Sequence, residues 1–409
     1  MWRHDVSEPL VIIGNGMAAA RLVEELGHLA LGRYAVAVIG QEPRLAYNRV
    51  LLSSVLAGEI GSQDIELKPA SWWRDHGVTL TYGCGANSID RDSRLVHLSN
   101  GTSVAYKKLV IATGSCALRL NVPGNDLDGV HTFRDSHDVD ILLGLAQGKK
   151  RVIVVGGGLL GLEAAYGLAK AGANVTLLHL MDRLMERQLD AGAAAVLKLR
   201  VEEKGIEILL NASTAKIIGD KRVEGVELAD GRSIAAEAVI FAAGIRPNTM
   251  LAENAGIAVN RGILVDDRMQ TNAEGVFALG ECAEHRGTCY GLVEPSYEQA
   301  RVLAGHLAGK ETSYKGSIVS TNLKVSGIGV FSAGDIEDRD GNETMTFRDV
   351  RRGIYKKLII ASGKLRGSVL VGDTQDALWY LELIRTEKQI APMRNELMFG
   401  RALAERIAA

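Results

Sequence analysis

Cysteine is scarce in this chain of 409 residues: there are four, with no CxxC pair and no metal-ligand spacing, at Cys84, Cys116, Cys282 and Cys289. No apolar run approaches the roughly 18 residues that cross a bilayer, and the first residues lack the apolar core of a secretion signal. The 47 Lys and Arg residues nearly balance 49 Asp and Glu, and a net charge of −2 creates no field that would hold nucleic acid or an anionic membrane. These absences predict a reduced, cytoplasmic protein with no nucleic-acid or membrane partner and no metal site.

Glycine, by contrast, is abundant, with 46 residues where an average share of about 7% would give roughly 29. Hydrophobic residues make up 47% of the chain and charged residues 23%, so a large core can form. At about 150 residues per domain, the length suggests two or three domains.

An internal repeat explains part of the glycine excess. Each copy starts with an apolar strand, Leu10–Ile13 or Arg151–Val155, followed by a glycine turn and a helical pattern. A second β-branched strand comes next, Tyr34–Ile39 or Asn174–Leu178. Strand, glycine turn, helix and strand form the βαβ unit that binds dinucleotides. One such match is weak, but two full copies in the same context make a coincidence improbable.

The order of the apolar runs predicts that the second unit is inserted into the first. Three further runs end in glycine as buried strands do, Leu109–Gly114, Ala238–Gly244 and Val276–Gly280. From about Ser317 alternating runs such as Tyr355–Ile360 indicate an antiparallel sheet, and Asp376–Arg385 has a helical pattern. We therefore expect an α/β fold of two nested Rossmann-like domains and a C-terminal α+β domain. The expected boundaries are 1–120 with 246–316, then 121–245, then 317–409.

The first fingerprint consists of Gly14, Gly16 and Ala19. Gly14 permits the tight turn, Gly16 lets the backbone approach a pyrophosphate, and Ala19 packs the helix on the sheet. The helix N-terminus, with free N–H groups and a positive dipole end, receives the phosphates. Glu42, just after the second strand, is the candidate for a ribose hydroxyl, although it could also be an ordinary exposed turn carboxylate before Pro43.

The second fingerprint is formed by Gly156, Gly158 and Gly161. An acid at the end of its second strand would indicate NADH, and arginines would indicate the 2′-phosphate of NADPH. His179 at that position is neither, and Arg183 nearby is either a cofactor contact or a solvated charge. Because no arginine pair is present, we expect NADH as the preferred cofactor, with NADPH left open.

Longer motifs resemble a known family. The paired fingerprints and the strand ends Thr113–Gly114 and Gly280–Glu281 are similar to the two-dinucleotide-binding, glutathione-reductase-like flavoprotein reductases. More specific segments resemble the large subunit of NAD(P)H-dependent nitrite reductase: Tyr47–Ser53, Val175–Asp190, Gly280–Gly287, Leu323–Gly327, Phe331–Asp335, Val371–Thr374 and Met398–Gly400. The resemblance covers nearly the whole chain.

The resemblance implies one FAD on the first unit and NAD(P)H on the second, with hydride transfer from nicotinamide C4 to flavin N5. It implies FAD contacts at Thr113, Gly114 and Gly280, a ribityl hydroxyl held by Glu281, and a cofactor contact at the strand end Gly244. The helix that opens at Pro295 would point its N-terminus at the flavin. Tyr297 on that helix could flank the flavin ring or be an ordinary core aromatic.

Two charged residues are candidates for a role in hydride transfer. Glu163 in the first turn of the second helix either compensates the helix dipole or, as in ferredoxin-reductase-like relatives, pairs with a basic residue beside flavin N5. Those relatives carry Arg and Lys in the segment matching Tyr47–Ser54. Here Arg49 remains and Ser54 stands where the lysine would be, so the pair is partial.

The electron acceptor is inferred from what the sequence lacks. The segment Tyr47–Leu52 holds no redox cysteine, and no cysteine cluster exists for iron–sulfur or siroheme centres. The resemblance therefore implies a reductase that passes electrons to a protein acceptor in nitrate or nitrite assimilation. Alternatives are a rubredoxin or ferredoxin reductase of another pathway and a non-catalytic flavin-binding subunit, and a homo-oligomer is left open.

A basic segment near the C-terminus offers a docking surface. Seven basic residues face a single acid, Asp349, in this stretch: Arg348, Arg351, Arg352, Lys356, Lys357, Lys364 and Arg366. They could bind an acidic partner protein or form a solvated strand edge that discourages aggregation.

Overall fold

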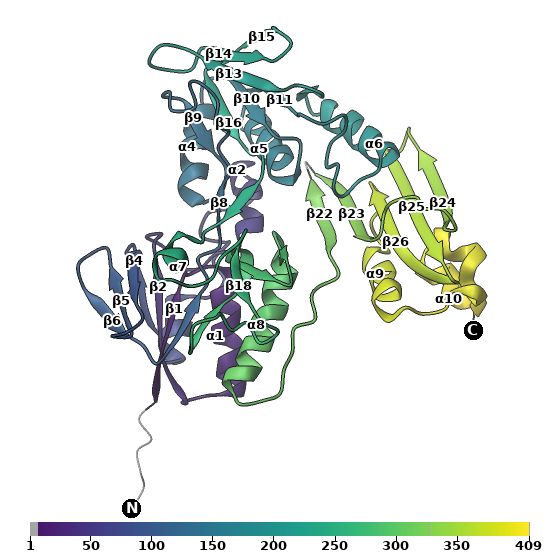
Figure 1. The fold of residues 1–409 in the computed structure, drawn as a ribbon. Coiled ribbons are helices and arrows are strands. Elements are labelled where there is room, and N and C mark those ends of the chain that lie inside the picture. Colours follow the sequence, from purple (N-terminus) through teal and green to yellow (C-terminus); the bar gives the residue numbers. More distant parts are fainter. Residues whose placement is uncertain (1–6, 326, 409) are drawn as a thin grey trace, which may run out of the picture. The chain divides into compact units, whose positions relative to one another are not determined.

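The structure is a computed structural model that describes residues 7–325 and 327–408, so the expected absence of a secretion signal concerns Met1–Val6, outside the described residues. The chain forms two compact units, each built from three segments (Figure 1). The first holds the residues up to Leu52, Ile60–Cys116 and Ile245–Ser317. The second holds Ser53–Glu59, Ala117–Gly244 and the residues from Ile318 on.

A five-stranded parallel sheet forms the centre of the first unit. Its strand order is β19 (Val276–Ala278), β7 (Lys108–Ile111), β1 (Glu8–Ile13), β2 (Tyr34–Gly40) and β3 (Thr79–Tyr82). Side chains alternate between the two faces of a strand, so Leu10 and Ile12 of β1 enter one core while Val11 and Ile13 enter another. The sheet is therefore buried on both faces, as parallel sheets are.

Helices cover one face of this sheet and small sheets cover the other. The apolar side of α1 (Met17–Leu29) packs there with α8 (Val293–Leu307), and α3 (Ala70–Asp75) contributes Trp73 to the same core. The opposite core contains residues of β4, β5 and their neighbours. The remaining elements of this unit are β4 (Ala86–Asp90), β5 (Leu95–Leu98), β6 (Ser103–Ala105), η1 (Arg49–Leu51), α7 (Met250–Asn254), β18 (Ile263–Val265), η2 (Gly280–Cys282), β20 (Ala283–His285) and β21 (Thr288–Cys289).

The second unit repeats the same sheet. Its parallel strands follow the order β12 (Glu207–Leu209), β11 (Asn174–Leu178), β10 (Arg151–Val155), β16 (Ala238–Phe241) and β9 (Val130–Thr132). Read from the other end, this order places β16, β10, β11 and β12 as β7, β1, β2 and β3 are placed in the first sheet. The predicted repeat and the predicted fold class are thereby confirmed.

Helices and a small antiparallel sheet complete the dinucleotide-type part of this unit. They are α4 (Ser136–Ala146), α5 (Leu159–Lys170), α6 (Ala191–Glu202), β13 (Thr214–Ile218), β14 (Gly225–Leu228) and β15 (Ser233–Ala235). Two short strands, β8 (Ser115–Ala117) and β17 (Ile245–Pro247), pair where the chain leaves and re-enters the first unit.

A short segment from early in the sequence also belongs to the second unit. Helix α2 (Leu52–Leu56) places Leu56, fully buried, so close to α5 that a Cβ on Gly167 would lie 2.7 Å from the Leu56 Cγ. Glu59 just beyond it pairs with Lys170 of α5 at 2.6 Å. The glycine at position 167 therefore creates the space that this segment fills.

The C-terminal part of the second unit is an antiparallel sheet covered by helices. Its order is β22 (Ser320–Val325), β23 (Ile328–Gly334), β26 (Lys364–Val371), β25 (Ile354–Ala361) and β24 (Glu343–Asp349). One face packs against a core formed with α9 (Ala377–Thr386), η3 (Ala391–Phe399) and α10 (Arg401–Ala408). The predicted antiparallel sheet and the helix predicted at Asp376–Arg385 are both present, with Asp376 directly before α9.

The other face of this sheet is held by α6 of the same unit. The Tyr355 hydroxyl donates to Asp190, the N-cap residue of α6, at 2.6 Å. A Cβ on Gly192 would lie 2.7 Å from the Tyr355 ring, so the glycine permits close contact. Lys357, buried, lies 3.4 Å from Asp190 and 3.0 Å from Asp338.

These contacts correct the expectation of a continuous basic surface. Lys356 and Lys357 are 8% and 3% exposed because β25 is an interior strand, and Lys356 pairs with Asp373 at 2.8 Å. Lys364 and Arg366 share Glu387. The two central lysines are neither a solvated edge nor a docking surface; of the seven, Arg348, Arg351 and Arg352 are exposed.

We predict that Lys357→Ala lowers the free energy of unfolding by about 2 kcal/mol, since removing one partner leaves Asp190 poorly compensated. Chemical denaturation measures this change. Arg348→Ala, on an exposed position of the neighbouring strand, is the control and should cost within about 0.5 kcal/mol. Equal stabilities of the two variants would contradict a supporting role of the buried lysine.

Candidate functional site

In the turn between β1 and α1, the first glycine, Gly14, has no space for a side chain. Gly14 has a φ of 114°, and a Cβ there would lie 2.1 Å from the carbonyl oxygen of Ala112 on the adjacent strand. A Cβ on Gly16, the N-cap of α1, would meet no atom within 4 Å. Ala19, one turn later, is fully buried against the sheet. The helix N-terminus therefore faces open space in which an anionic group can reach its N–H groups.

The second fingerprint has the same geometry. Gly156 has a φ of 128°, and a Cβ there would lie 2.3 Å from the Ala242 carbonyl oxygen. Gly158 again has open space beside it, whereas a Cβ on Gly161 would lie 1.8 Å from the carbonyl oxygen of Gly156. Gly244 follows β16 with a φ of 121° and open space at its Cβ position. We call the open spaces at Gly16 and Gly158 the first and second cradle.

Three strand and helix ends meet beside the first cradle. The Gly280 N–H donates to the Gln299 side chain of α8 at 2.8 Å, and the Ser115 hydroxyl donates to Glu281 at 2.9 Å. A Cβ on Gly280 would come within 3.1 Å of Ala18 in α1, and one on Gly114 within 3.8 Å of the Glu281 carboxylate. The sequence-predicted residues of the FAD site are therefore brought together in one unit.

Thr113 contributes to the same region through a reciprocal contact. Its hydroxyl donates to the Asn248 carbonyl at 3.0 Å, and the Asn248 side chain donates to the Thr113 carbonyl at 2.8 Å. This pair fixes the strand end that carries Gly114, although Asn248 carries no sequence signal of such a role.

Buried polar atoms without a partner support a polar ligand at this cradle. Asn15 Oδ1, Arg44 Nε and Gln299 Nε2 are buried and have no hydrogen bond to the described residues. Asn15 lies between the two glycines of the fingerprint, and Gln299 is 1% exposed. Because buried polar atoms are normally satisfied, a bound group with many polar atoms, such as FAD, fits these residues.

Glu42 lies in a network of side chains. The Tyr47 hydroxyl donates to one carboxylate oxygen of Glu42 at 2.6 Å, and Arg49 pairs with the other. Arg49 also donates to the Tyr47 hydroxyl at 2.9 Å, and the Arg44 guanidinium lies 4.6 Å from the centre of the Tyr47 ring. Arg49 thus lies with Glu42 beyond the end of β2. The contacts of Tyr47 and Arg44 with this network have no signal in the sequence.

Glu163 lies in the second unit and is 7% exposed in the first turns of α5. The described residues give it no hydrogen bond or ion pair. Burial raises the pKa of Glu163 to about 8. This carboxyl group can therefore hold a proton at neutral pH, which a solvated dipole-compensating acid would not do.

His179, which replaces the expected acid after β11, is buried and bonded on both ring nitrogens. The Gly157 N–H lies 2.9 Å from Nδ1, and Nε2 lies 3.2 Å from the Glu186 carboxylate. Arg183 pairs with Asp182 at 3.0 Å. Sequence reasoning missed Glu186, because it stands eight positions beyond the strand end.

The remaining candidates have ordinary packing. Tyr297 is half-buried near the start of α8 with the Arg21 guanidinium 5.7 Å from its ring centre, and burial raises its pKa. All four cysteines are free, and Cys282 is fully buried, which raises the pKa of its thiol. Among the described residues no cluster could hold a metal ion. No described helix is long and apolar enough to cross a membrane.

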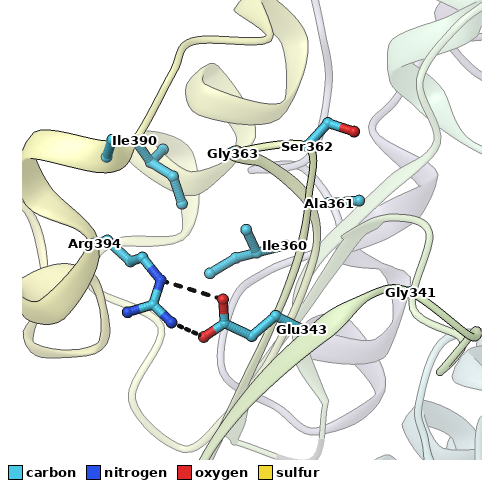
Figure 2. A pocket seen from close by; sticks show the side chains of 9 residues that line it. Gly341, Glu343, Ile360, Ala361, Ser362, Gly363, Ile390 and Arg394 are labelled. Atoms are coloured by element: carbon cyan, nitrogen blue, oxygen red, sulfur yellow. Dashed lines mark hydrogen bonds and ion pairs between the residues drawn. The ribbon is translucent and has the colours of Figure 1, made fainter.

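A further cleft lies at the C-terminal antiparallel sheet. It has a volume of about 230 Å³ and lies between the β25–β26 turn and η3 (Figure 2). Its two charged side chains, Glu343 and Arg394, are joined in a salt bridge across it. Because their charges neutralise each other, the cleft offers little attraction to a charged ligand.

The buried Glu163 generates a prediction about pH. Its folded-state pKa of about 8 exceeds the ordinary value of 4.5, so the folded protein holds a proton that the unfolded chain releases between these values. The free energy of unfolding should therefore fall as pH rises from about 5 to 8, by about 1.4 kcal/mol per unit of pKa shift at most. Denaturation at several pH values should show a smaller fall for Glu163→Gln. Glu202→Gln on α6 is the control, and a fall in Glu163→Gln as large as in the control would contradict the shifted pKa.

Comparisons with known proteins agree with this geometry. Residues 8–302 match the family model of pyridine nucleotide-disulphide oxidoreductases, and residues 320–388 match that of the rubredoxin NAD⁺ reductase C-terminal domain. The chain is 44% identical over 383 residues to a nitrite reductase [NAD(P)H] of Bacillus subtilis, covering 93% of this chain and 48% of that one. It is 41% identical over 390 residues to an assimilatory nitrate reductase electron transfer subunit of the same organism, covering 95% and 51%. The chain thus spans about half the length of these curated relatives.

A solved structure extends the similarity to the fold. The NADH:rubredoxin oxidoreductase from Clostridium acetobutylicum superposes with a TM-score of 0.77 and 28% identity, covering 94% of this chain and 97% of that one. The predicted family resemblance is confirmed. With two glycine cradles of the same construction and a family model that matches most of its length, the chain belongs to the pyridine nucleotide-disulphide oxidoreductases.

Proposed function

We propose that this chain passes electrons from NADH by way of bound FAD to a protein acceptor of nitrate or nitrite assimilation, in the cytoplasm. The observation that carries the proposal is the presence of two open cradles, at Gly16 and Gly158, on two parallel sheets of the same strand order. The proposed domains keep the boundaries expected from the sequence: 1–120 with 246–316 for FAD, 121–245 for NADH, and 317–409 for the C-terminal domain.

The first cradle is assigned to FAD. When bound, FAD supplies the conversion between the two electrons of NADH and the single electrons that a protein acceptor takes. Gly14, Gly16 and Ala19 shape the pyrophosphate contact, while Thr113, Gly114, Gly280 and Glu281 hold the ribityl chain. Glu42, fixed by Tyr47 and Arg49, serves a ribose hydroxyl, and Tyr297 lies on the helix that approaches the flavin.

The second cradle is assigned to the nicotinamide dinucleotide. Gly156, Gly158 and Gly161 allow the pyrophosphate to approach the N-terminus of α5, and Gly244 borders the same space. Glu163 is assigned to hydride transfer, in which it would orient the nicotinamide and hold a proton. Its burial and its raised pKa support this role, since an uncharged carboxylic acid can donate a hydrogen bond. For Arg49, assigned to the same step from the sequence, the contacts with Glu42 and Tyr47 favour cofactor binding.

The kind of acceptor is inferred from the cysteines and from the relatives. Cys282 is fully buried, and its S–H group donates hydrogen bonds to backbone carbonyl oxygens. It therefore cannot relay electrons as an exposed thiolate does. Direct transfer to a docked protein agrees with this arrangement. The names of the two Bacillus subtilis relatives favour an acceptor in nitrate or nitrite reduction.

A second candidate is a rubredoxin or ferredoxin reductase of another pathway. It is favoured by the C-terminal match at residues 320–388 and by the solved NADH:rubredoxin oxidoreductase, which this chain covers almost completely. A non-catalytic flavin-binding subunit is the third reading. The three readings differ in whether NADH reduces the flavin and in which protein then oxidises it.

The test is anaerobic mixing of the purified flavoprotein with NADH, followed by addition of one acceptor at a time. We expect the yellow colour to bleach and to return rapidly with the cognate nitrate or nitrite reductase component. Faster return with rubredoxin or ferredoxin would favour the second candidate, and an unbleached flavin would favour the non-catalytic subunit. Acid precipitation should release all the flavin, since no covalent link is expected.

Two matched glycine variants separate the roles of the cradles. We predict that Gly16→Val purifies with less than a tenth of the wild-type flavin, because the valine side chain occupies the space assigned to the pyrophosphate. Gly158→Val should retain its flavin and its bleaching by dithionite but lose at least tenfold in the rate of reduction by NADH. Absorbance spectra and stopped-flow mixing measure both effects. The assignment of the cradles would be reversed if Gly158→Val lost flavin while Gly16→Val kept it.

A further inference from the structure

The second cradle lacks an acid where the first has one. In dinucleotide-binding units an acid near the end of the second strand binds a ribose hydroxyl of the adenosine. The first copy has Glu42 two positions after β2 ends at Gly40. In the second copy β11 ends at Leu178 and His179 follows, so the strand end itself offers no carboxylate.

His179 connects the glycine turn to an acid from another segment. Its Nδ1 lies 2.9 Å from the Gly157 N–H and accepts that hydrogen bond, so Nδ1 carries no proton. A neutral imidazole then carries its proton on Nε2, which lies 3.2 Å from a Glu186 carboxylate oxygen. Nε2 therefore donates to Glu186, and a Cβ on Gly157 would lie 2.5 Å from the His179 ring. The ring is packed directly on the turn that receives the pyrophosphate.

The segment that carries Glu186 is also fixed to this turn. The Met185 N–H donates to the Gly157 carbonyl at 3.0 Å, and the Leu189 N–H donates to the Met185 carbonyl at 2.8 Å. Met185 and Leu189 are each 1% exposed, whereas the Glu186 side chain retains 25% exposure. Both backbone groups of Gly157 are thus used to hold Glu186 in place, one directly through Met185 and one through His179.

The surroundings of this carboxylate suit an adenosine without a 2′-phosphate. Leu180 and Met181, directly after His179, are 64% and 43% exposed and offer an apolar surface for a purine base. Arg183 is held by Asp182 at 3.0 Å and by the Leu189 carbonyl at 3.4 Å. Arg183, the arginine nearer the strand end, is therefore already paired.

We propose that Glu186, positioned by His179, binds the adenosine ribose hydroxyls of NADH in place of a strand-end acid and rejects the 2′-phosphate of NADPH by charge repulsion. Glu186 is the specificity residue and His179 the positioning residue. The inference rests on the proposed assignment of the second cradle to NADH. The proposal explains how His179 can replace the acid at the end of β11 while Glu186 still supplies a carboxylate to the ribose.

Calorimetric titration of the flavin-loaded protein with ADP-ribose and with 2′-phospho-ADP-ribose tests the proposal without catalysis. Wild type should bind ADP-ribose at least tenfold more tightly than the phosphorylated ligand. Glu186→Gln should weaken ADP-ribose binding about tenfold and reduce the discrimination between the two ligands. Glu224→Gln, an exposed acid between β13 and β14 of the same unit, is the matched control and should stay within twofold of wild type for both ligands.

A second variant separates positioning from folding. His179→Asn keeps a side-chain oxygen near the place of Nδ1 to accept from Gly157, but it lacks the atom that reaches Glu186. We expect it to lose ADP-ribose affinity as Glu186→Gln does, with unchanged flavin content and melting temperature. Combining both substitutions should cause little further loss, because the two side chains act as one unit.

Binding of ADP-ribose by Glu186→Gln within twofold of wild type, with unchanged discrimination, would overturn the proposal. Wild-type affinity in His179→Asn would remove the positioning role. These outcomes are distinct from failure of the proposed function, in which the wild-type protein itself binds neither ligand and its flavin is not bleached by NADH.

Discussion

The close approach of a glycine turn to the adjacent strand is the contact on which both cofactor assignments depend. At Gly14 and Gly156 the turn passes so near a carbonyl oxygen of the next strand, Ala112 or Ala242, that a Cβ would lie 2.1 or 2.3 Å from it. This contact sets where the following helix begins and directs its N-terminus to the carboxyl edge of the sheet. The open spaces beside Gly16 and Gly158 lie two positions after these contacts, at the N-terminus of the following helix.

The same sheet supports different surroundings in the two copies. Around the first cradle, Glu42, Arg49 and Tyr47 form a charged network. Several buried polar side-chain atoms there have no hydrogen-bond partner among the described residues. Around the second, Glu163 is buried with no charged partner among the residues that the structure describes, and the His179 ring packs on the turn. A polar, permanently held group suits the first arrangement. A dinucleotide that must enter and leave suits the second, where few of the polar atoms depend on the ligand for their hydrogen bonds.

Local patterns in the sequence predicted what depends on local geometry. The strands at Leu10–Ile13 and Arg151–Val155, their glycine turns and the antiparallel C-terminal sheet are present because periodicity and glycine placement are short-range signals. Lys356 and Lys357 were misread, since a run of basic residues does not reveal that β25 lies inside a sheet covered by α6. Glu186 escaped notice for a related reason: its approach to His179 depends on the path of a loop, which spacing from the fingerprint does not encode.

The short helix α2 has a consequence for dissecting this protein. Because Leu56 fills the space over Gly167 and Glu59 pairs with Lys170, a fragment cut at the edges of the inserted unit, 121–245, would expose an apolar groove on α5. Neither unit is a continuous stretch of chain, so a stable excised domain would need residues 53–59 grafted back through a linker. The sequence repeat looks modular, but the second unit includes residues 53–59 from an earlier part of the chain. Recombination with other reductases would have to keep the contacts of this segment with α5.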